Sequence, residues 1–145
     1  MKIVVQRVVE ASVVIDGSIV GQIGAGLLLL VGLSVGDSSE QLVWMARKVV
    51  GLRIFNRDGL MQDSVLDMGG EILAVSQFTL LGDCRKGKRP SFVNAMPASS
   101  AKSMFDEFIL TLEKEFGRSI QTGRFGEHMQ INLVNDGPVT IILER

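Results

Sequence analysis

Hydrophobic and polar positions alternate over the first part of the chain, which predicts β-strands. Residues 2–9 and 11–15 follow this alternation and are rich in valine. Asp16-Gly17 is typical of a tight type I′ hairpin turn, so residues 19–23 are expected to return antiparallel. The leucine-rich run at 27–33 predicts a buried strand. Together these segments predict a meander of about four strands.

Two later segments repeat hydrophobic residues at helical spacing. Ser38 and Gln41 stand at capping-box spacing before the first of them. Its apolar face comprises Leu42, Met45, Ala46, Val49 and Val50. A second helix is expected at about 99–116, with Gly117 placed as its carboxy-terminal cap. The wide apolar face of that helix comprises Met104, Phe105, Phe108, Ile109, Leu112 and Phe116.

The remaining apolar segments predict strands. Residues 71–75 open a strong strand that is expected to run on through 76–80. Two closing strands, at about 128–135 and 139–144, are expected on either side of Gly137-Pro138. Turns are expected at 56–59 and 69–70, and an exposed loop at 82–97. Many strands, two helices and no βαβ rhythm predict an α+β fold: a curved, largely antiparallel β-sheet or barrel with two main helices packed on one side.

Composition narrows the class of protein. A chain of 145 residues has the size of one domain, so residues 1–145 are expected to form a single domain. With 46% apolar and 21% charged residues, the chain resembles soluble globular proteins. No export signal is recognised, and a single cysteine, Cys84, cannot form an internal disulfide, which fits the cytoplasm. The net charge of −1 argues against coating of long nucleic acids, but it allows a local RNA contact.

Several catalytic chemistries lack the residues that they require. The chain has one histidine, His128, which is expected to be an ordinary residue of the alternating strand rather than a catalytic base. One histidine and one cysteine cannot supply the usual metal-binding sets, so no metal is expected. The aspartates are too scattered to argue for a paired-carboxylate site. No strand-to-helix phosphate loop is present, and no cofactor is expected.

Three polar stretches remain as candidates for a site. Ser76-Gln77-Phe78-Thr79 interrupts an apolar strand, and the pattern alone favours a half-exposed strand over groups facing a cavity. Arg85-Lys86-Gly87-Lys88-Arg89 is usually a solvated loop, although it could hold a phosphate or two. Residues 135–140 form either a plain turn or a rigid set of backbone acceptors, because proline has no N–H to donate.

These three stretches, in this order and at this separation, resemble the D-aminoacyl-tRNA deacylases of the bacterial and eukaryotic type. Residues 76–80 match the Ser-Gln-Phe-Thr motif of that family, and residues 135–140 match its Gly-Pro motif without a change. The likeness extends over the whole chain, including the opening residues 5–8, the Asp16-Gly17 hairpin and the stretch 85–92.

The resemblance implies a cytoplasmic enzyme that hydrolyses the ester joining a D-amino acid to the terminal adenosine of tRNA. It also implies activity on glycyl-tRNA mischarged on tRNA-Ala, and no cofactor. It further implies a homodimer in which Gly137-Pro138 is a cis peptide inserted into the partner's site. By resemblance, the catalytic residues are Ser76, Gln77, Phe78 and Thr79; substrate is bound by Gly137, Pro138, Met129, Asn135 and Arg7; and tRNA is bound by Arg85, Lys86, Lys88 and Arg89.

The lack of a catalytic histidine, of a metal-binding set and of a carboxylate pair is consistent with such a reaction. An aminoacyl ester is already activated, and the neighbouring ribose 2′-hydroxyl of the substrate reduces the need for a protein base. Backbone N–H groups at Phe78 and Thr79 would stabilise the oxyanion. Carbonyls of Gly137-Pro138 would accept from the substrate ammonium, and their main chain would block an L side chain. Two alternatives stay open: Thr79 as an acyl-accepting nucleophile, and a non-catalytic module that binds RNA ends.

Overall fold

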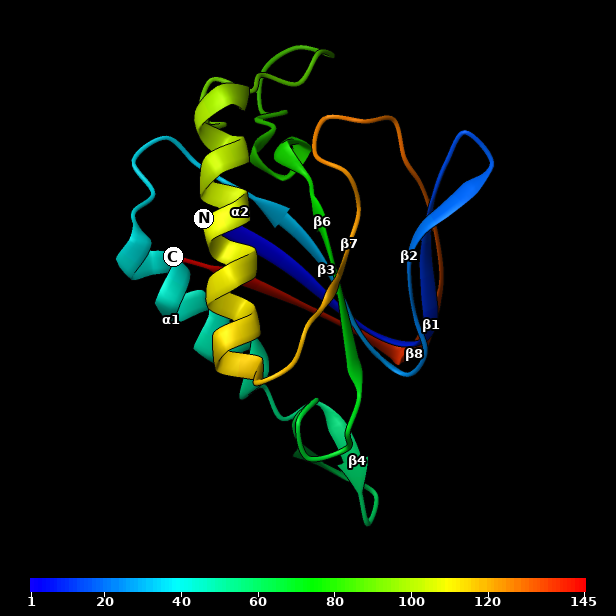
Figure 1. The fold of residues 1–145 in the computed structure, drawn as a ribbon. Coiled ribbons are helices and arrows are strands. Elements are labelled where there is room, and N and C mark those ends of the chain that lie inside the picture. The colour runs from blue at the N-terminus through cyan, green and yellow to red at the C-terminus, as the bar shows by residue number, and fades with distance from the viewer.

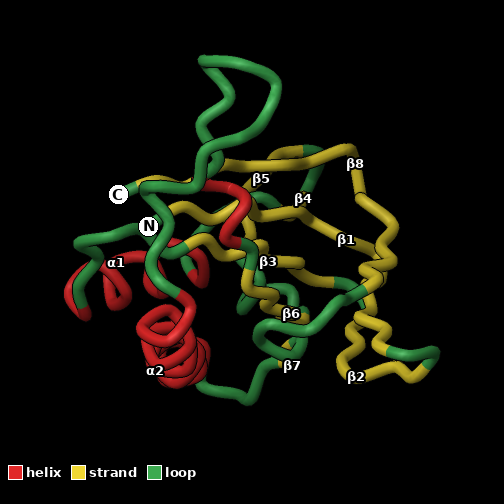
Figure 2. The backbone as a smooth tube through the Cα atoms, turned by 90° about the horizontal axis from the view of Figure 1, so that it is seen from above, coloured by secondary structure: helices red, strands yellow, loops and turns green.

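A nearly closed, mixed β-sheet carries two helices on one side (Figures 1 and 2). The computed structural model describes residues 1–145. The main sheet consists of β1 (Lys2–Ile15), β2 (Ser18–Ile23), β3 (Gly26–Gly32), β6 (Glu71–Ser76), β7 (Gln121–Thr122) and β8 (Gln130–Glu144). The helices are α1 (Ser39–Val50), α2 (Ala98–Phe116) and the short 3-10 helix η1 (Phe78–Leu81). A separate ribbon consists of β4 (Phe55–Arg57) and β5 (Leu60–Asp63). None of the helices combines the length and apolar character needed to cross a lipid bilayer.

Strand β1 organises the sheet. It is one strand of 14 residues, whereas the sequence pattern predicted two shorter ones. β3 pairs with Lys2–Val8 and β2 with Ala11–Ile15, while β8 pairs along most of the length of β1. Because β1 is long enough to hold two shorter strands end to end, β2 and β3 share one of its edges and β8 occupies the other. The expected four-strand meander is therefore wrong. The Asp16-Gly17 turn is confirmed, since both residues have the positive φ of a type I′ turn, 48° and 77°.

The sheet also contains two parallel pairings, β3 with β6 and β6 with β7. The chain passes through α1 between the first pair and through α2 between the second. The expectation of no strand–helix–strand rhythm was therefore wrong. The β4–β5 ribbon interrupts the first crossover, and β7 is only two residues long, so neither unit stands out in the sequence. The α+β class, the curved sheet and the two helices on one side are confirmed.

The two helices and the sheet enclose the larger core, a cluster of 25 buried hydrophobic residues. The buried residues of α1 are the five predicted from helical spacing. The Ser38 N–H donates to Gln41 Oε1 at 2.7 Å, as expected of a capping box. Helix α2 ends at Gly117, whose φ of 74° and hydrogen bond to the Glu113 carbonyl, 2.8 Å, confirm the predicted cap. A smaller cluster lies under the β1–β2 hairpin and comprises Val8, Ala11, Val13, Ile23, Leu28, Leu73 and Val75.

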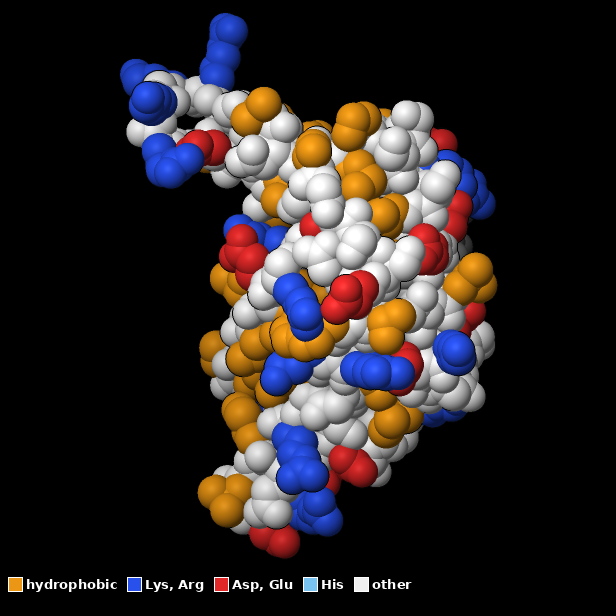
Figure 3. Space-filling view, turned by 90° about the vertical axis from the view of Figure 1, so that its left-hand side faces the viewer, with side chains coloured by type: hydrophobic (Ala, Val, Ile, Leu, Met, Phe, Trp, Pro, Cys, Tyr) orange, Lys and Arg blue, Asp and Glu red, His pale blue; other side chains and the backbone are white.

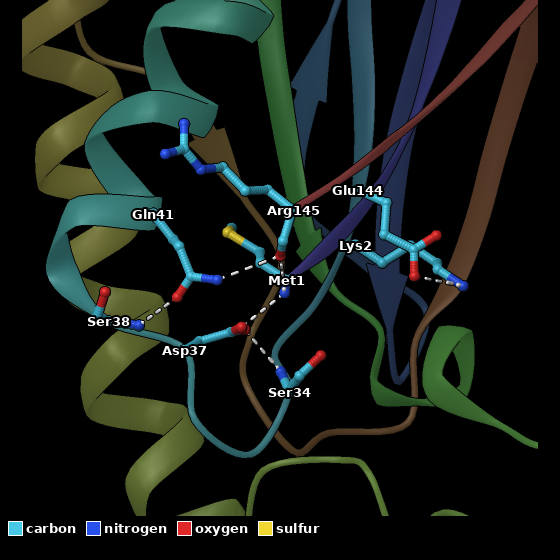
Figure 4. Close-up of polar contacts among 8 residues, drawn as sticks. All are labelled: Met1, Lys2, Ser34, Asp37, Ser38, Gln41, Glu144 and Arg145. Carbon is cyan, nitrogen blue, oxygen red and sulfur yellow. Dashed lines mark hydrogen bonds and ion pairs between the residues drawn. The ribbon is translucent and has the colours of Figure 1, made fainter.

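The two chain ends meet at the start of α1 (Figure 4). The buried Met1 ammonium donates to Asp37 Oδ1 at 2.6 Å and to the Arg145 carbonyl at 2.8 Å. The second Asp37 oxygen accepts from the Ser34 N–H at 2.7 Å. Gln41 Nε2 also donates to the Arg145 carbonyl, at 3.3 Å. These bonds fix the outer ends of the paired strands β1 and β8 against the helical layer.

The turn expected at 56–59 is part of a hairpin that the sequence pattern did not predict. Asp58 and Gly59 have φ values of 54° and 81°, so they form a second turn with two left-handed residues between β4 and β5. The strands of this hairpin are short and mostly exposed, which removes the hydrophobic alternation that usually identifies a strand.

Candidate active site

The first part of the site lies where β6 ends. The strand stops at Ser76, and residues 78–81 turn into η1, so the expectation of a strand running through 80 is wrong. The Gln77 N–H still donates to the Val31 carbonyl of β3, at 2.7 Å. The turn packs directly on β3 at Gly32, where a Cβ atom would lie 2.4 Å from Leu81 Cδ2 and 3.1 Å from the Gln77 carbonyl oxygen. The absence of a side chain at Gly32 therefore allows η1 to lie over the end of the neighbouring strand.

The amino-terminal turn of η1 presents backbone donors. A helix offers no intrahelical acceptor to the N–H groups of its first turn, which here include those of Phe78 and Thr79. Gln77 occupies the N-cap position, but its side chain makes no capping bond. The Gln77 amide instead donates to the Thr79 hydroxyl. The two N–H groups are thus left for a ligand with a negative or partly negative oxygen.

A cavity of about 480 Å³ lies beside these donors. Ten of its 15 lining residues are hydrophobic. Ser76, Gln77 and Phe78 form one wall, and Met129 lines the same cavity, whereas Thr79 is not among its lining residues. Other walls come from the start of α2 and from the segment between β7 and β8. The structure therefore brings the Ser-Gln-Phe part of the motif together with Met129, which lies 51 to 53 positions further along the sequence.

His128 and Glu127 also line this cavity, and the sequence analysis did not identify them as site residues. His128 was expected within an alternating strand; it lies instead in the exposed segment just before β8. The only sequence signal that could have drawn attention to it is its position next to Met129. A side chain at this position can contact a bound ligand, because it is exposed at the cavity.

The second part of the site is Gly137-Pro138. Its peptide bond is cis, as the resemblance implied. β8 continues through it as one strand, so the expectation of two separate strands is wrong. β1 pairs with Asn135 on one side and Thr140 on the other, and the pairing register shifts between them. Gly137 has a φ of 124°, and a Cβ atom there would lie 2.7 Å from Val139 Cγ2 and 3.0 Å from Arg7 Nη2. The motif is therefore a bulge in a continuous strand.

Two side chains brace this bulge. Arg7 is 5% exposed. Its Nε lies 2.8 Å from Asp136 Oδ2 and donates to the Asp136 carbonyl at 3.2 Å. Its Nη1 donates to the Ile54 carbonyl at 2.5 Å. The Asn135 side chain accepts from the Val139 N–H at 2.9 Å and donates to the Val139 carbonyl at 3.2 Å. The Asn135 side chain therefore satisfies both the N–H and the carbonyl of Val139. Gly137 and Pro138 themselves are exposed, and neither they nor the two braces line the cavity described above.

The third stretch, the basic loop, projects from the body of the molecule (Figure 3). Arg85 folds back on Asp83, with Nη2 at 2.6 Å from Oδ2 and Nε at 2.9 Å from Oδ1. The side-chain hydrogen bonds from Arg85 lower the pKa of Asp83, and the same contact raises the pKa of Arg85. Lys86, Lys88 and Arg89 are exposed and take part in no ion pair. Three of the four basic side chains are thus available to an anion.

Comparison with known proteins identifies the family. Residues 4–144 match the family model described as D-Tyr-tRNA(Tyr) deacylase. The chain belongs to this family of ester hydrolases. Proteins named D-aminoacyl-tRNA deacylase from Desulfitobacterium hafniense (strain DSM 10664 / DCB-2) and Thermotoga petrophila are each 52% identical to it over 145 residues, which cover 99% of this chain and 97% of each relative. The resemblance drawn from the motifs is confirmed.

Two solved structures are similar to this chain in fold. One described as c-Myc DNA Unwinding Element Binding Protein has a TM-score of 0.95 and 43% identity, covering 100% of this chain and 99% of the other. A second, described as a probable eukaryotic D-amino acid tRNA deacylase, has a TM-score of 0.84 at 18% identity and shows the shared fold alone.

Proposed function

We propose that this protein hydrolyses the ester bond of D-aminoacyl-tRNA and releases free D-amino acid and tRNA. The observation that carries the proposal is the free amino-terminal turn of η1 at the wall of an apolar cavity, in a chain that belongs to the deacylase family. Donors at a helix start suit an ester carbonyl on which negative charge develops. Ser76, Gln77, Phe78 and Thr79 act in catalysis, and Met129 contacts substrate across the cavity.

The reaction needs few side-chain groups. Water attacks the ester carbonyl carbon, and the N–H groups of Phe78 and Thr79 stabilise the oxyanion, each donor contributing about 3–4 kcal/mol. The bond to the ribose 3′-oxygen then breaks, and that oxygen takes up a proton as the tRNA leaves. The neighbouring 2′-hydroxyl of the substrate assists proton transfer, because it lies next to the reacting bond. This arrangement requires neither a metal nor a cofactor.

The alternative in which Thr79 attacks the ester is less well supported. A nucleophilic hydroxyl needs a base to take its proton. The Thr79 hydroxyl accepts a hydrogen bond from the Gln77 amide, which withdraws electron density rather than adding it. If Thr79 were the nucleophile, its replacement by alanine would abolish turnover and wild-type protein would accumulate an acyl-enzyme. We expect an active Thr79→Ala variant and no trapped acyl-enzyme.

Substrate selection involves Gly137-Pro138 of a second copy of the chain. These residues are exposed and do not line the cavity of their own chain, so their carbonyls reach a substrate ammonium only in a partner's site. β8 also exposes the hydrophobic side chains of Val134 and Ile142, which a second copy of the chain could cover in a homodimer. Arg7 and Asn135 hold the bulge in place. An L side chain would meet the Gly137-Pro138 main chain, whereas glycine has no side chain to reject, so glycyl-tRNA mischarged on tRNA-Ala is also a substrate.

The tRNA body contacts the basic loop, and the reaction takes place in the cytoplasm. Exposed cations around Gly87 can wrap a phosphate. The decisive experiment incubates purified protein with D-tyrosyl-tRNA and L-tyrosyl-tRNA and follows release of the amino acid. We expect release from the D ester only. If the protein binds both D-tyrosyl-tRNA and L-tyrosyl-tRNA but releases no amino acid from either, the result would instead favour a non-catalytic RNA-end binding module.

A further inference from the structure

The turn η1 packs on β3 at Gly32, but it places no buried side chain in the core. None of its four residues is buried, and the Phe78 side chain is 56% exposed. Elements that present backbone donors must be rigid, because a misplaced donor contributes little to the stabilisation of a transition state. The contacts that hold η1 from outside the core therefore determine how well its N–H groups are positioned.

One such contact comes from Phe92, in the same loop that carries the basic residues. The rings of Phe92 and Phe78 meet edge to face, with centroids 5.1 Å apart and an interplanar angle of 68°. This geometry is the favourable one for an aromatic pair. Phe92 is thus the aromatic partner of the residue whose N–H is the proposed oxyanion donor.

The backbone around Phe92 is itself firmly held. Asp83 and Ser91 exchange two backbone hydrogen bonds, of 2.8 and 2.9 Å, which close the base of the loop. On the other side, the Met96 N–H donates to the Leu33 carbonyl at 2.9 Å, and the Val35 N–H donates to the Asn94 carbonyl at 3.0 Å. Phe92 therefore stands between a closed loop base and a segment tied to the end of β3.

The tip of the same loop carries the free charges. Arg85 is occupied by Asp83 at the loop base, whereas Lys86, Lys88 and Arg89 lie beyond it and have no acidic partner. A phosphate bound at the tip would restrict the loop, and the closed base would pass that restriction to Phe92.

Resting on the proposed function, we propose that Phe92 is a positioning residue: it holds Phe78, and with it the oxyanion-binding N–H groups, in the catalytic arrangement. The basic tip of the loop is then connected to η1 through the base of the loop and the contact between Phe92 and Phe78.

The test compares two substrates, D-tyrosyl-tRNA and the D-tyrosyl ester of adenosine alone, and separates kcat from KM. Phe92→Ala should lower kcat about 3- to 10-fold on both, since the loss corresponds to one aromatic pair. Phe92→Tyr keeps the ring and should restore kcat to within about twofold. The matched control is Val93→Ala, which truncates the exposed neighbouring side chain and should leave both constants unchanged. Lys88→Met, at the tip, should raise KM for D-tyrosyl-tRNA instead.

A double-mutant cycle tests whether Phe92 acts through Phe78. In a Phe78→Ala background, Phe92→Ala should cause no further loss of kcat. Unchanged kcat in Phe92→Ala, a change confined to KM for the tRNA, or additive losses in the cycle would overturn the proposal. If wild-type protein releases no amino acid from D-tyrosyl-tRNA, the proposed function fails as well. An active wild type with an unaffected Phe92→Ala variant refutes the positioning role alone.

Discussion

Arg7 provides a sharp test of how the Gly-Pro bulge is supported, because one guanidinium bridges two segments that are distant in the sequence. In Arg7→Met the Ile54 carbonyl loses its donor; since Ile54 is buried, this costs about 1–3 kcal/mol. The ion pair with Asp136 contributes less, about 0–1 kcal/mol, because the Asp136 side chain is 49% exposed. Methionine keeps much of the apolar stem in place. We therefore expect the free energy of unfolding to fall by about 1–4 kcal/mol.

The assay is urea unfolding followed by the fluorescence of Trp44, the single tryptophan, at a fixed protein concentration because a homodimer is proposed. The matched control is Asp136→Asn, which keeps the backbone carbonyl and the Ile54 contact and should cost no more than about 1 kcal/mol. If Arg7→Met unfolds within about 1 kcal/mol of the wild type, or the control costs as much as the test variant, the buried bond to Ile54 does not support the bulge.

Two further perturbations probe the turn η1 and the acid stability of the chain. Gly32→Ala would place a Cβ atom 3.1 Å from the Gln77 carbonyl oxygen and 3.2 Å from Leu80 Cβ, neither of which can rotate away, so η1 should shift. We expect a loss of about 1–3 kcal/mol in unfolding free energy and a reduced kcat on D-tyrosyl-tRNA. Unchanged kcat would contradict the role of that close approach. Hydrogen bonds from the Ser64 side chain and backbone lower the pKa of Asp67 below its ordinary 3.8. The lowered pKa contributes stability that is present above 3.8 and is lost as the pH falls towards the folded-state value. Ser64→Ala should therefore be less stable than wild type at pH 7, and urea unfolding at about pH 3 should show a smaller difference.

Local features of this protein follow from residues that lie close together in the sequence. The Asp16-Gly17 turn, the buried face of α1 and the Gly117 cap each depend on backbone preferences and spacing within one or two turns of chain, and each formed as predicted. The family motifs at 76–80 and 135–140 are equally local, so they could be recognised without a structure. The contacts that these residues make with distant segments depend on the whole fold, and the predictions about strand ends and strand partners were wrong.

The end of β6 shows why a local pattern cannot predict where a strand stops. The pattern at 71–80 is compatible with a strand throughout, but the chain turns at Gln77 because Gly32, on another strand, leaves room for η1. β8 likewise passes through Gly137-Pro138 as one strand because β1 pairs on both sides of the bulge. The parallel pairings through α1 and α2 were missed for a similar reason, since strand partners are set by packing between distant segments.

The sequence by itself determined the α+β class, the helix faces, the tight turns and the residues of the motifs, because these depend on short-range periodicity and on the chemistry of single side chains. Only the tertiary structure decided that the Ser-Gln-Phe stretch meets Met129 at a cavity, that Arg7 reaches across to Asp136 and Ile54, and that Gly137-Pro138 does not line the cavity of its own chain. These relations join residues up to about 130 positions apart, and no local pattern encodes a contact whose partners are brought together by the folding of the whole sheet.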